Sequence, residues 1–154
     1  MKEENITFSN AETCLIMEPM HGNSQGNVHG GELMKIMDNI AGIVGFKHSK
    51  GAVVTARVDE LVFHNPINIG DIITCMGQLA YVGTSSMQII VKIVVHDLNN
   101  YSQPKTALSA FFTMVHLKNG LPSPVTKLFA KTKEDEELYK LGERKYLEIK
   151  AKFN

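Results

Sequence analysis

The sequence lacks both an excess of charge of one sign and any long hydrophobic run. In its 154 residues 16 Lys and Arg balance 16 Asp and Glu, so the formal net charge is zero. Nucleic acids and anionic membranes attract basic proteins, and neither is expected as the main partner. No apolar run approaches the roughly 20 residues that span a bilayer, and the charged segment 1–5 lacks the apolar stretch of a signal peptide. We therefore expect a cytoplasmic protein with no membrane partner and no nucleic-acid partner.

Residue patterns for metal binding and for nucleophilic catalysis are also scarce. Cys14 and Cys75 are far apart and show no metal-type spacing, which favours two reduced, core-type thiols over a disulfide. The six histidines are scattered, so no zinc site is expected. There is no Gly-x-Ser-x-Gly elbow, and neither cysteine lies in a glycine-rich or electropositive segment. An enzyme with this sequence is expected to work by direct attack of water.

The pattern of apolar residues predicts one α+β domain. The length fits a single domain, 1–154, with a core at about 7–118 and a C-terminal helical extension at about 131–152. Helical periodicity covers 32–48, and after it short runs rich in Val, Ile, Phe and Thr indicate strands. The expected strands are 7–17, 53–63, 71–82, 86–96 and 106–117. Short turns between consecutive strands favour antiparallel pairing in a sheet that can wrap around the helix.

A second helix is expected after a turn-rich surface segment at 118–131. Thr132 is the predicted N-cap, and Asp135 three residues later gives a near capping box. Glu136 and Lys140 form an i,i+4 pair in the favourable order. The apolar positions make only a thin stripe, so this helix is expected on the surface or against another subunit.

The first helix carries a carboxylate beside its apolar stripe. The stripe consists of Leu33, Ile36, Met37, Ile40, Ala41 and Val44. Asp38 falls about a quarter turn away from it, on the flank that also holds Gly31, Gly42 and Gly45. Glycine inside a helix costs about 1 kcal/mol relative to alanine, so this cluster indicates close approach by a substrate, by a helix of a second subunit, or by both. Considered alone, Asp38 fits a solvated surface carboxylate better, and the glycine flank with the adjoining His-Gly-Gly turn reverses that preference.

The segment before this helix combines an amide with a glycine turn. Asn23 precedes His29-Gly30-Gly31, which runs directly into the helix. A helix N-terminus presents unpaired N–H groups, which can stabilise the oxyanion of a tetrahedral intermediate. The alternatives are that the glycines merely start the helix and that Asn23 only caps the loop. With Asp38 as a general base, the set suits hydrolysis of an activated carbonyl such as a thioester, whose thiolate needs little acid assistance to leave.

An ordered series of motifs covers most of the chain. It reads Asn23-x-x-Gly26-Asn27-Val28-His29-Gly30-Gly31-x-x-Met34-x-x-Met37-Asp38, Val54-Thr-Ala-Arg57-Val58-Asp59 with Phe63, Pro66-Ile with Gly70-Asp71, Thr84-Ser85-Ser86-Met87, Ser109-Ala-Phe-Phe-Thr-Met, and Gly142-Glu-Arg144-Lys145-Tyr-Leu. This series resembles the acyl-CoA thioesterases of the hotdog fold, including the brain-type acyl-CoA hydrolase branch, in a single-domain form. The motifs together are far more specific than any one of them.

The resemblance implies a fold, an assembly and an activity. A hotdog fold has a long helix wrapped by a curved antiparallel sheet, here with a C-terminal helix added. Two subunits would pair edge to edge as a homodimer, often within a trimer of dimers. The implied catalytic residues are Asn23 and Asp38 from opposite subunits, with the N–H groups of Gly30 and Gly31. The implied reaction, in fatty acid metabolism, converts fatty acyl-CoA to free fatty acid and CoA; no cofactor is required, because coenzyme A is part of substrate and product.

For recognition of the coenzyme A portion, the resemblance points to three short segments. They are Arg57-Val58-Asp59, Ser85-Ser86-Met87 and Arg144-Lys145. Arginine and lysine side chains match phosphate groups. A solvated helix face remains an equal interpretation for Arg144 and Lys145, and ordinary turn chemistry for Ser85 and Ser86.

Two other functions remain possible on the same fold. A non-catalytic acyl-CoA-binding or sensing protein would bind the ligand without turnover, and the joint presence of Asn23 and Asp38 argues against it. A hydratase or dehydratase would use a histidine with a carboxylate, and only His64-Asn65-Pro66 suggests it. The fold alone does not decide among these functions.

Overall fold

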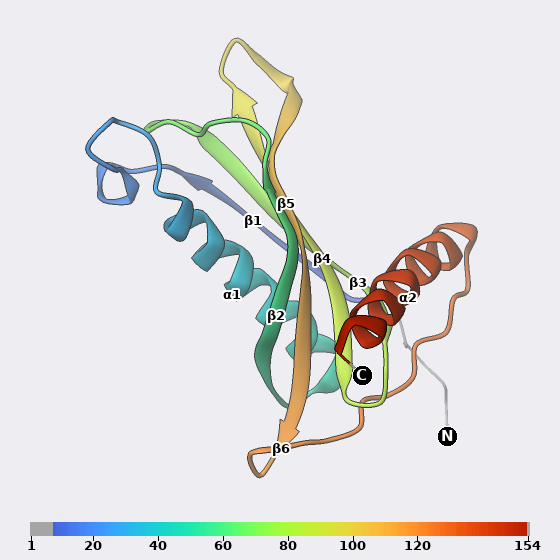
Figure 1. Cartoon of the computed structure of the whole chain (residues 1–154). Coiled ribbons are helices and arrows are strands. Elements are labelled where there is room, and N and C mark those ends of the chain that lie inside the picture. The colour runs from blue at the N-terminus through green and yellow to red at the C-terminus, as the bar shows by residue number, and fades with distance from the viewer. Residues whose placement is uncertain (1–7, 154) are drawn as a thin grey trace.

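The computed structural model describes residues 8–153. Its elements, in chain order, are β1 (Asn10–Ile16), a short 3-10 helix η1 (Pro19–His21), α1 (Gly30–Ser49), β2 (Ala52–Phe63), β3 (Ile72–Val82), β4 (Ser86–Asp97), β5 (Asn100–Lys118), β6 (Leu121–Pro122) and α2 (Lys133–Phe153). Figure 1 shows a long central helix against a curved sheet, with α2 lying at the sheet's other side. No helix within this range is long and apolar enough to cross a membrane.

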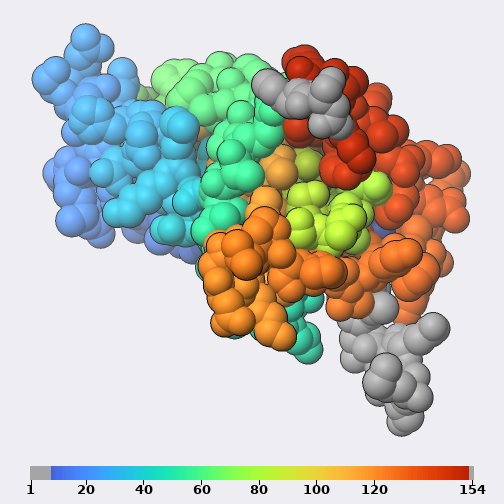
Figure 2. All heavy atoms as spheres, turned by 60° about the horizontal axis from the view of Figure 1, so that its bottom comes forward, coloured from blue at the N-terminus to red at the C-terminus, as the bar shows by residue number. Residues whose placement is uncertain are grey.

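The sheet is antiparallel, in the order β1-β3-β4-β5-β2, and β6 pairs with the end of β5. Within the described residues β2 pairs with β5 alone, so β2 is an edge strand. In the space-filling view its teal-green residues lie on the surface between the light-blue α1 and the red α2 (Figure 2). The expected α+β architecture, a helix wrapped by an antiparallel sheet and followed by a C-terminal helix, is confirmed.

The core lies between α1 and the inner face of the sheet. Five residues of the predicted stripe, Leu33, Met37, Ile40, Ala41 and Val44, are at most 4% exposed, and the sixth, Ile36, is half-buried against the core. The helix lies close to the sheet at Gly77, where an added Cβ would lie 2.7 Å from Ile40 and 3.1 Å from Val44. The apolar stripe of α1 therefore fixes the helix on the sheet.

The glycine flank of α1 has two environments. Gly45 is buried against the chain's own sheet, where an added Cβ would lie 3.4 Å from Met87 and 3.5 Å from Val53. Gly42 and Gly31 are more open, since Met114 is the nearest neighbour of Gly42 at 3.9 Å and nothing lies within 4 Å at Gly31. The expectation of close approach by a ligand or second subunit is therefore wrong for Gly45.

Most element boundaries lie within a few residues of the predicted ones, with β5 as the main exception. The break expected around 97–104 is instead a tight hairpin, in which Asp97 pairs with Asn100 and accepts a hydrogen bond of 2.9 Å from the Asn99 N–H group. Hydrogen bonding with β4 keeps the first residues of β5 extended although they are turn-forming residue types. The first strand was expected at 7–17; Thr7 lies outside the described residues, and β1 begins at Asn10.

The start of α2 has the predicted capping residues. The Asp135 N–H group donates to Thr132 Oγ1, and the Lys131 N–H group donates to Asp135 Oδ2, both at 3.1 Å. The helix lies on the surface, one of its two expected locations, and it packs on the outer face of its own sheet. There an added Cβ at Gly142 would lie 2.6 Å from Tyr81, whose ring contacts the rings of Tyr139 and Tyr146 at centroid distances of 5.0 and 5.1 Å.

Candidate active site

Asn23 organises the loop that leads into α1. Its Oδ1 atom accepts hydrogen bonds from the N–H groups of Gln25, at 2.9 Å, and Asn27, at 3.1 Å. The Asn23 N–H group in turn donates to the Asn27 carbonyl at 2.8 Å. Gly26 closes the turn with φ +81°, which glycine adopts readily. The loop-capping role is therefore present, and the same side chain also lines a pocket at the start of α1.

This pocket lies at the N-terminus of α1 and has a volume of about 390 Å³. It is lined by Asn23, Asn27, Val28, Gly30, Leu33, Phe63, His64, Asn65, Pro66 and Ile67. The first turn of the helix is closed by hydrogen bonds from Glu32 and Leu33 to the His29 carbonyl, at 3.0 and 3.3 Å. His29, the N-cap, makes no side-chain capping bond, so its side chain does not occupy the backbone N–H groups of the first turn.

Gly30 lies close to the ring of Phe63 in this pocket. An added Cβ at Gly30 would lie 3.2 Å from two atoms of the Phe63 ring, whereas Gly31 faces open space. Phe63 is 54% exposed, so its ring covers the helix start from the solvent side. The arrangement admits a polar atom near the Gly30 and Gly31 N–H groups and can polarise a carbonyl there.

Asp38 lies in a second, more open groove between α1 and β2. The groove has a volume of about 910 Å³ and is lined by Asp38, Asn39, Gly42, Ile43, Phe46, Val53, Val54, Thr55 and Met114. The Thr55 hydroxyl donates a hydrogen bond to Asp38 Oδ1. Asp38 is thus an exposed carboxylate held by a neighbouring hydroxyl, beside the apolar surface of Ile43 and Phe46, which are 49% and 57% exposed.

The two centres do not converge within one subunit. Gly30 and Asp38 are eight residues apart on the same helix, and at 1.5 Å per residue their backbones are separated by about 12 Å along its axis. Within one chain Asp38 and Gly30 line two separate pockets.

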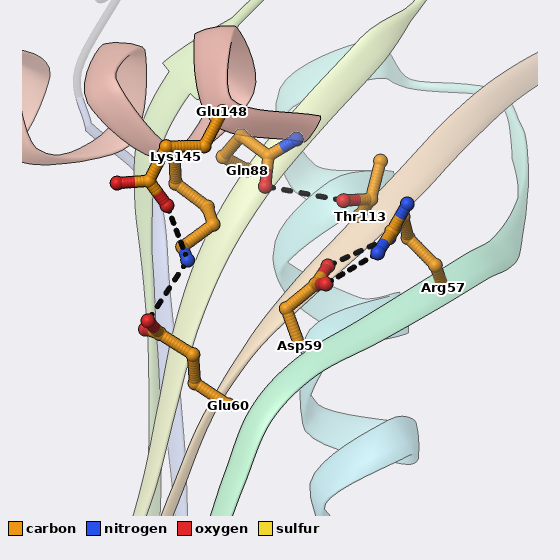
Figure 3. Close-up of polar contacts among 7 residues, drawn as sticks. All are labelled: Arg57, Asp59, Glu60, Gln88, Thr113, Lys145 and Glu148. Atoms are coloured by element: carbon orange, nitrogen blue, oxygen red, sulfur yellow. Dashed lines mark hydrogen bonds and ion pairs between the residues drawn. The ribbon is translucent and has the colours of Figure 1, made fainter. Parts of the chain in front are cut away.

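Of the segments expected to contact coenzyme A, the first is an ion pair on β2. Arg57 Nε lies 2.8 Å from Asp59 Oδ2, and Arg57 Nη2 lies 2.5 Å from Asp59 Oδ1 (Figure 3). Both side chains stand on the outer face of the sheet and are partly exposed, at 29% and 15%. Val58, between them, is half-buried and packs against the core.

The second segment is a strand start with one buried residue. The Ser85 carbonyl accepts the His116 N–H group at 2.9 Å, and the Ser86 carbonyl accepts the Gly83 N–H group at 2.8 Å. These bonds are the turn chemistry given above as the alternative. Met87 is fully buried beneath Gly45, so the expectation that it contacts a ligand is wrong.

The third segment divides into an exposed and a buried residue. Arg144 is exposed on α2, but Lys145 is 8% exposed and pairs with Glu60 at 3.0 Å and Glu148 at 2.9 Å. Burial lowers the pKa of Lys145, but hydrogen bonds and charge attraction from Glu148 and Glu60 outweigh it and leave that pKa raised. Lys145 is therefore an internal ion-pair residue, and both earlier interpretations of it, a phosphate contact and a solvated surface residue, are wrong.

Two residues that sequence reasoning did not single out have defined places here. Thr55 donates a hydrogen bond to Asp38 across the groove, and Glu60 forms an ion pair with Lys145. Thr55 lies within a motif quoted above, but its contact with Asp38 depends on how β2 packs beside α1. Within residues 8–153 no group of three or more His, Cys, Asp or Glu side chains is placed to hold a metal ion.

Comparison with known proteins gives consistent matches. The model of the thioesterase superfamily matches residues 25–99. The cytosolic acyl coenzyme A thioester hydrolase of Mus musculus is 37% identical over 149 residues, which cover 96% of this chain but 39% of that protein, so the chain spans well under half of that relative. A hexameric acyl-CoA thioesterase matches with a TM-score of 0.85 and 26% identity over 93% of this chain and 92% of the other.

A further solved structure is an acyl-CoA hydrolase from Staphylococcus aureus in complex with butyryl coenzyme A, coenzyme A and coenzyme A disulfide. It matches with a TM-score of 0.79 and 30% identity, over 93% of this chain and 90% of the other. Structures of the same hydrolase carry alanine in place of one asparagine, an aspartate fifteen residues later, and a threonine seventeen residues after that aspartate. Asn23, Asp38 and Thr55 are separated by the same two intervals.

Proposed function

This chain belongs to the hotdog-fold thioesterase superfamily, and from that premise we propose that it is an acyl-CoA thioesterase, which hydrolyses fatty acyl-CoA to free fatty acid and coenzyme A. The observation that carries the proposal is the pairing of Thr55 with Asp38 in an open groove, at the spacing of the residues altered in the Staphylococcus hydrolase. The cytoplasm is the proposed location, in line with the name of the mouse relative. No cofactor takes part in the proposed reaction.

In the proposed reaction Asp38 is the general base. Thr55 orients the carboxylate, which takes a proton from water as the water oxygen attacks the thioester carbonyl carbon. The oxyanion that forms accepts hydrogen bonds from the N–H groups at Gly30 and Gly31. The C–S bond then breaks, coenzyme A leaves as a thiolate that solvent protonates, and Asp38 releases its proton to solvent. Asn23 positions water or carbonyl at the pocket that it lines.

The proposed active unit is a homodimer. The separation of Gly30 from Asp38 supports it, because the two residues line different pockets of one chain and a second chain can bring a base to the oxyanion donors. The exposed edge of β2 and the apolar residues of the Asp38 groove support pairing of two copies at this side. A trimer of dimers is the proposed larger assembly, in line with the hexameric relative.

For recognition of the coenzyme A portion we retain only residues that a ligand can reach. They are Arg57, Asp59, Ser85, Ser86 and Arg144. Arg57 and Arg144 suit phosphate groups because the guanidinium fork matches phosphate oxygens. Arg57 would exchange part of its pairing with Asp59 for such a contact. A non-catalytic acyl-CoA sensor is the alternative function, and it differs only in the absence of turnover.

The test is thiol release from a short-chain and a long-chain acyl-CoA by the wild type, Asp38→Asn and Thr55→Val. We expect kcat to fall at least 100-fold in Asp38→Asn, because a general base contributes about 10² to 10⁴ in rate. We expect a smaller fall in Thr55→Val, because the carboxylate remains but loses its orientation. Lys140→Met, an exposed change on α2, serves as the control and should leave kcat unchanged.

Coenzyme A binding by all variants separates the two functions. Turnover in the wild type that collapses in Asp38→Asn while coenzyme A still binds is the expected result. Tight binding without turnover in the wild type would reject the enzyme and leave the sensor. Full activity in Asp38→Asn would remove Asp38 from the mechanism.

A further inference from the structure

We propose that Lys145 is a positioning residue: it holds a bulge in β2 and thereby places Phe63 over the Gly30 turn. The expected effect of Lys145 on turnover rests on the proposed function, whereas its effect on the structure of β2 does not. The Lys145 latch is defined as Lys145 with its two carboxylate partners, Glu60 and Glu148 (Figure 3).

The bulge is visible in the pairing of β2 with β5. Asp59 pairs with Phe111 and Val62 with Ser109, so three steps along β2 match two steps along β5. The extra residue falls at Glu60–Leu61, and Glu60 has φ +53°. A side chain with a Cβ rarely adopts this left-handed conformation, so surrounding contacts must hold it.

The latch supplies such a contact from a different element. Lys145 extends from α2 across β5, where its Nζ atom lies 5.3 Å from the centroid of the Phe111 ring. The same atom lies 3.0 Å from Glu60 Oε1 at the bulge. The Lys145 side chain is only 10% exposed, whereas Glu60 is 59% exposed. Through Lys145, α2 thus holds Glu60, the one residue of β2 with a left-handed backbone conformation.

The bulge decides which face of the sheet Phe63 occupies. Side chains alternate between faces along a strand, and one extra residue reverses the alternation beyond it. Asp59 stands on the outer face with Arg57, and without the bulge Phe63, four residues later, would also face outward. With the bulge, Phe63 lies on the α1 side, with its ring 3.2 Å from the Cβ position of Gly30. The Lys145–Glu60 contact on the outer face therefore determines where Phe63 lies at the pocket on the inner face.

The test compares Lys145→Met with the double variant Lys145→Met, Glu60→Gly. In the single variant we expect kcat for acyl-CoA to fall about 10-fold to 100-fold, because small misplacements at a reacting centre have effects of this size. We expect KM and coenzyme A binding to stay unchanged. Glu60→Gly in the same background should restore kcat, because glycine adopts the left-handed conformation without the latch. Glu60→Ala in that background is the matched control and should not restore it.

A second readout is independent of hydrolysis. Amide hydrogen exchange at residues 60–63 should speed up in Lys145→Met. It should speed up more weakly in Glu60→Gln, which keeps Lys145 paired with Glu148. Glu60→Gln replaces Lys145→Met in this test if Lys145→Met does not fold. Glu60→Gly should return exchange toward the wild type in the Lys145→Met background. These results support the latch even if the wild type has no turnover, in which case only the proposed function fails. Unchanged exchange at 60–63, or a rise in KM with kcat intact, would overturn the latch.

Discussion

The two cysteines show how the strand face decides the chemistry of a single residue. Cys14 on β1 and Cys75 on β3 are on neighbouring strands, since Cys75 pairs with Thr13. Cys75 is fully buried, and this burial raises the pKa of its thiol to about 12. Cys14 is exposed, so the expectation of two core thiols holds for Cys75 alone, and both thiols are free.

This contrast predicts the pattern of thiol labelling. In the native protein, iodoacetamide should modify Cys14 and spare Cys75, because the thiolate is the reacting form and Cys75 does not form it. Raising the pH from 7 to 9 should still leave Cys75 unmodified, because its raised pKa keeps the thiol protonated. Mass spectrometry of tryptic peptides gives the site, and Cys14→Ser should remove native labelling altogether. Modification of native Cys75 at pH 9 would contradict the burial argument.

Some candidate site residues can be placed from local sequence patterns, and others only from the contacts between elements. Asp38 could be placed beside the apolar stripe from helical geometry alone, because α1 is a regular local element. Thr55 could not be joined to it, since their contact depends on packing of β2 beside α1. The motif series indicated Met87 and Lys145 by their place in the chain, which does not reveal burial. Both therefore appeared available to a ligand when they are enclosed.

At the scale of elements, local patterns predicted the helices better than the strands. The stripe of α1 and the cap of α2 at Thr132 are set by residues within a few positions, and both are confirmed. The bulge at Glu60 and the early start of β5 depend on pairing with a neighbouring strand. No local pattern specifies them, because the partner strand supplies the hydrogen bonds.

The approach of α1 to the sheet at Gly77 gives the prediction for this scale. Gly77→Ala should lower the free energy of unfolding by about 1–3 kcal/mol, because its Cβ would overlap Ile40 and Val44 in a packed core. Gly42→Ala is the matched control, with its nearest neighbour at 3.9 Å. It should raise helix stability by up to about 1 kcal/mol. Urea unfolding of both variants measures the difference, and equal midpoints would show that the core yields at Gly77.

For the whole molecule, the central feature is that one chain holds both halves of the proposed site without joining them. Asn23 and Gly30 lie at one end of α1, and Asp38 lies in a groove about 12 Å further along the helix. The β2 edge and the exposed side chains of Ile43 and Phe46 border the Asp38 groove. Pairing of two copies by a two-fold axis would bring the halves together twice, because each chain then supplies one half to each site.

Mixing two inactive subunits tests this arrangement. Asn23→Ala and Asp38→Asn chains, co-expressed at equal levels, should regain roughly a quarter of wild-type activity, because half of the dimers are mixed and one of their two sites carries both native residues. Each variant expressed alone should stay inactive. A mixture of Asp38→Asn with Thr55→Val is a useful contrast, because those residues contact each other within one chain. Their mixed dimers hold one groove altered at Asp38 and one altered at Thr55, with no fully native groove, so they gain nothing beyond the average of the two variants. If the Asn23→Ala and Asp38→Asn mixture also shows only the average of its parents, Asn23 and Asp38 act within the same chain and the shared site is wrong.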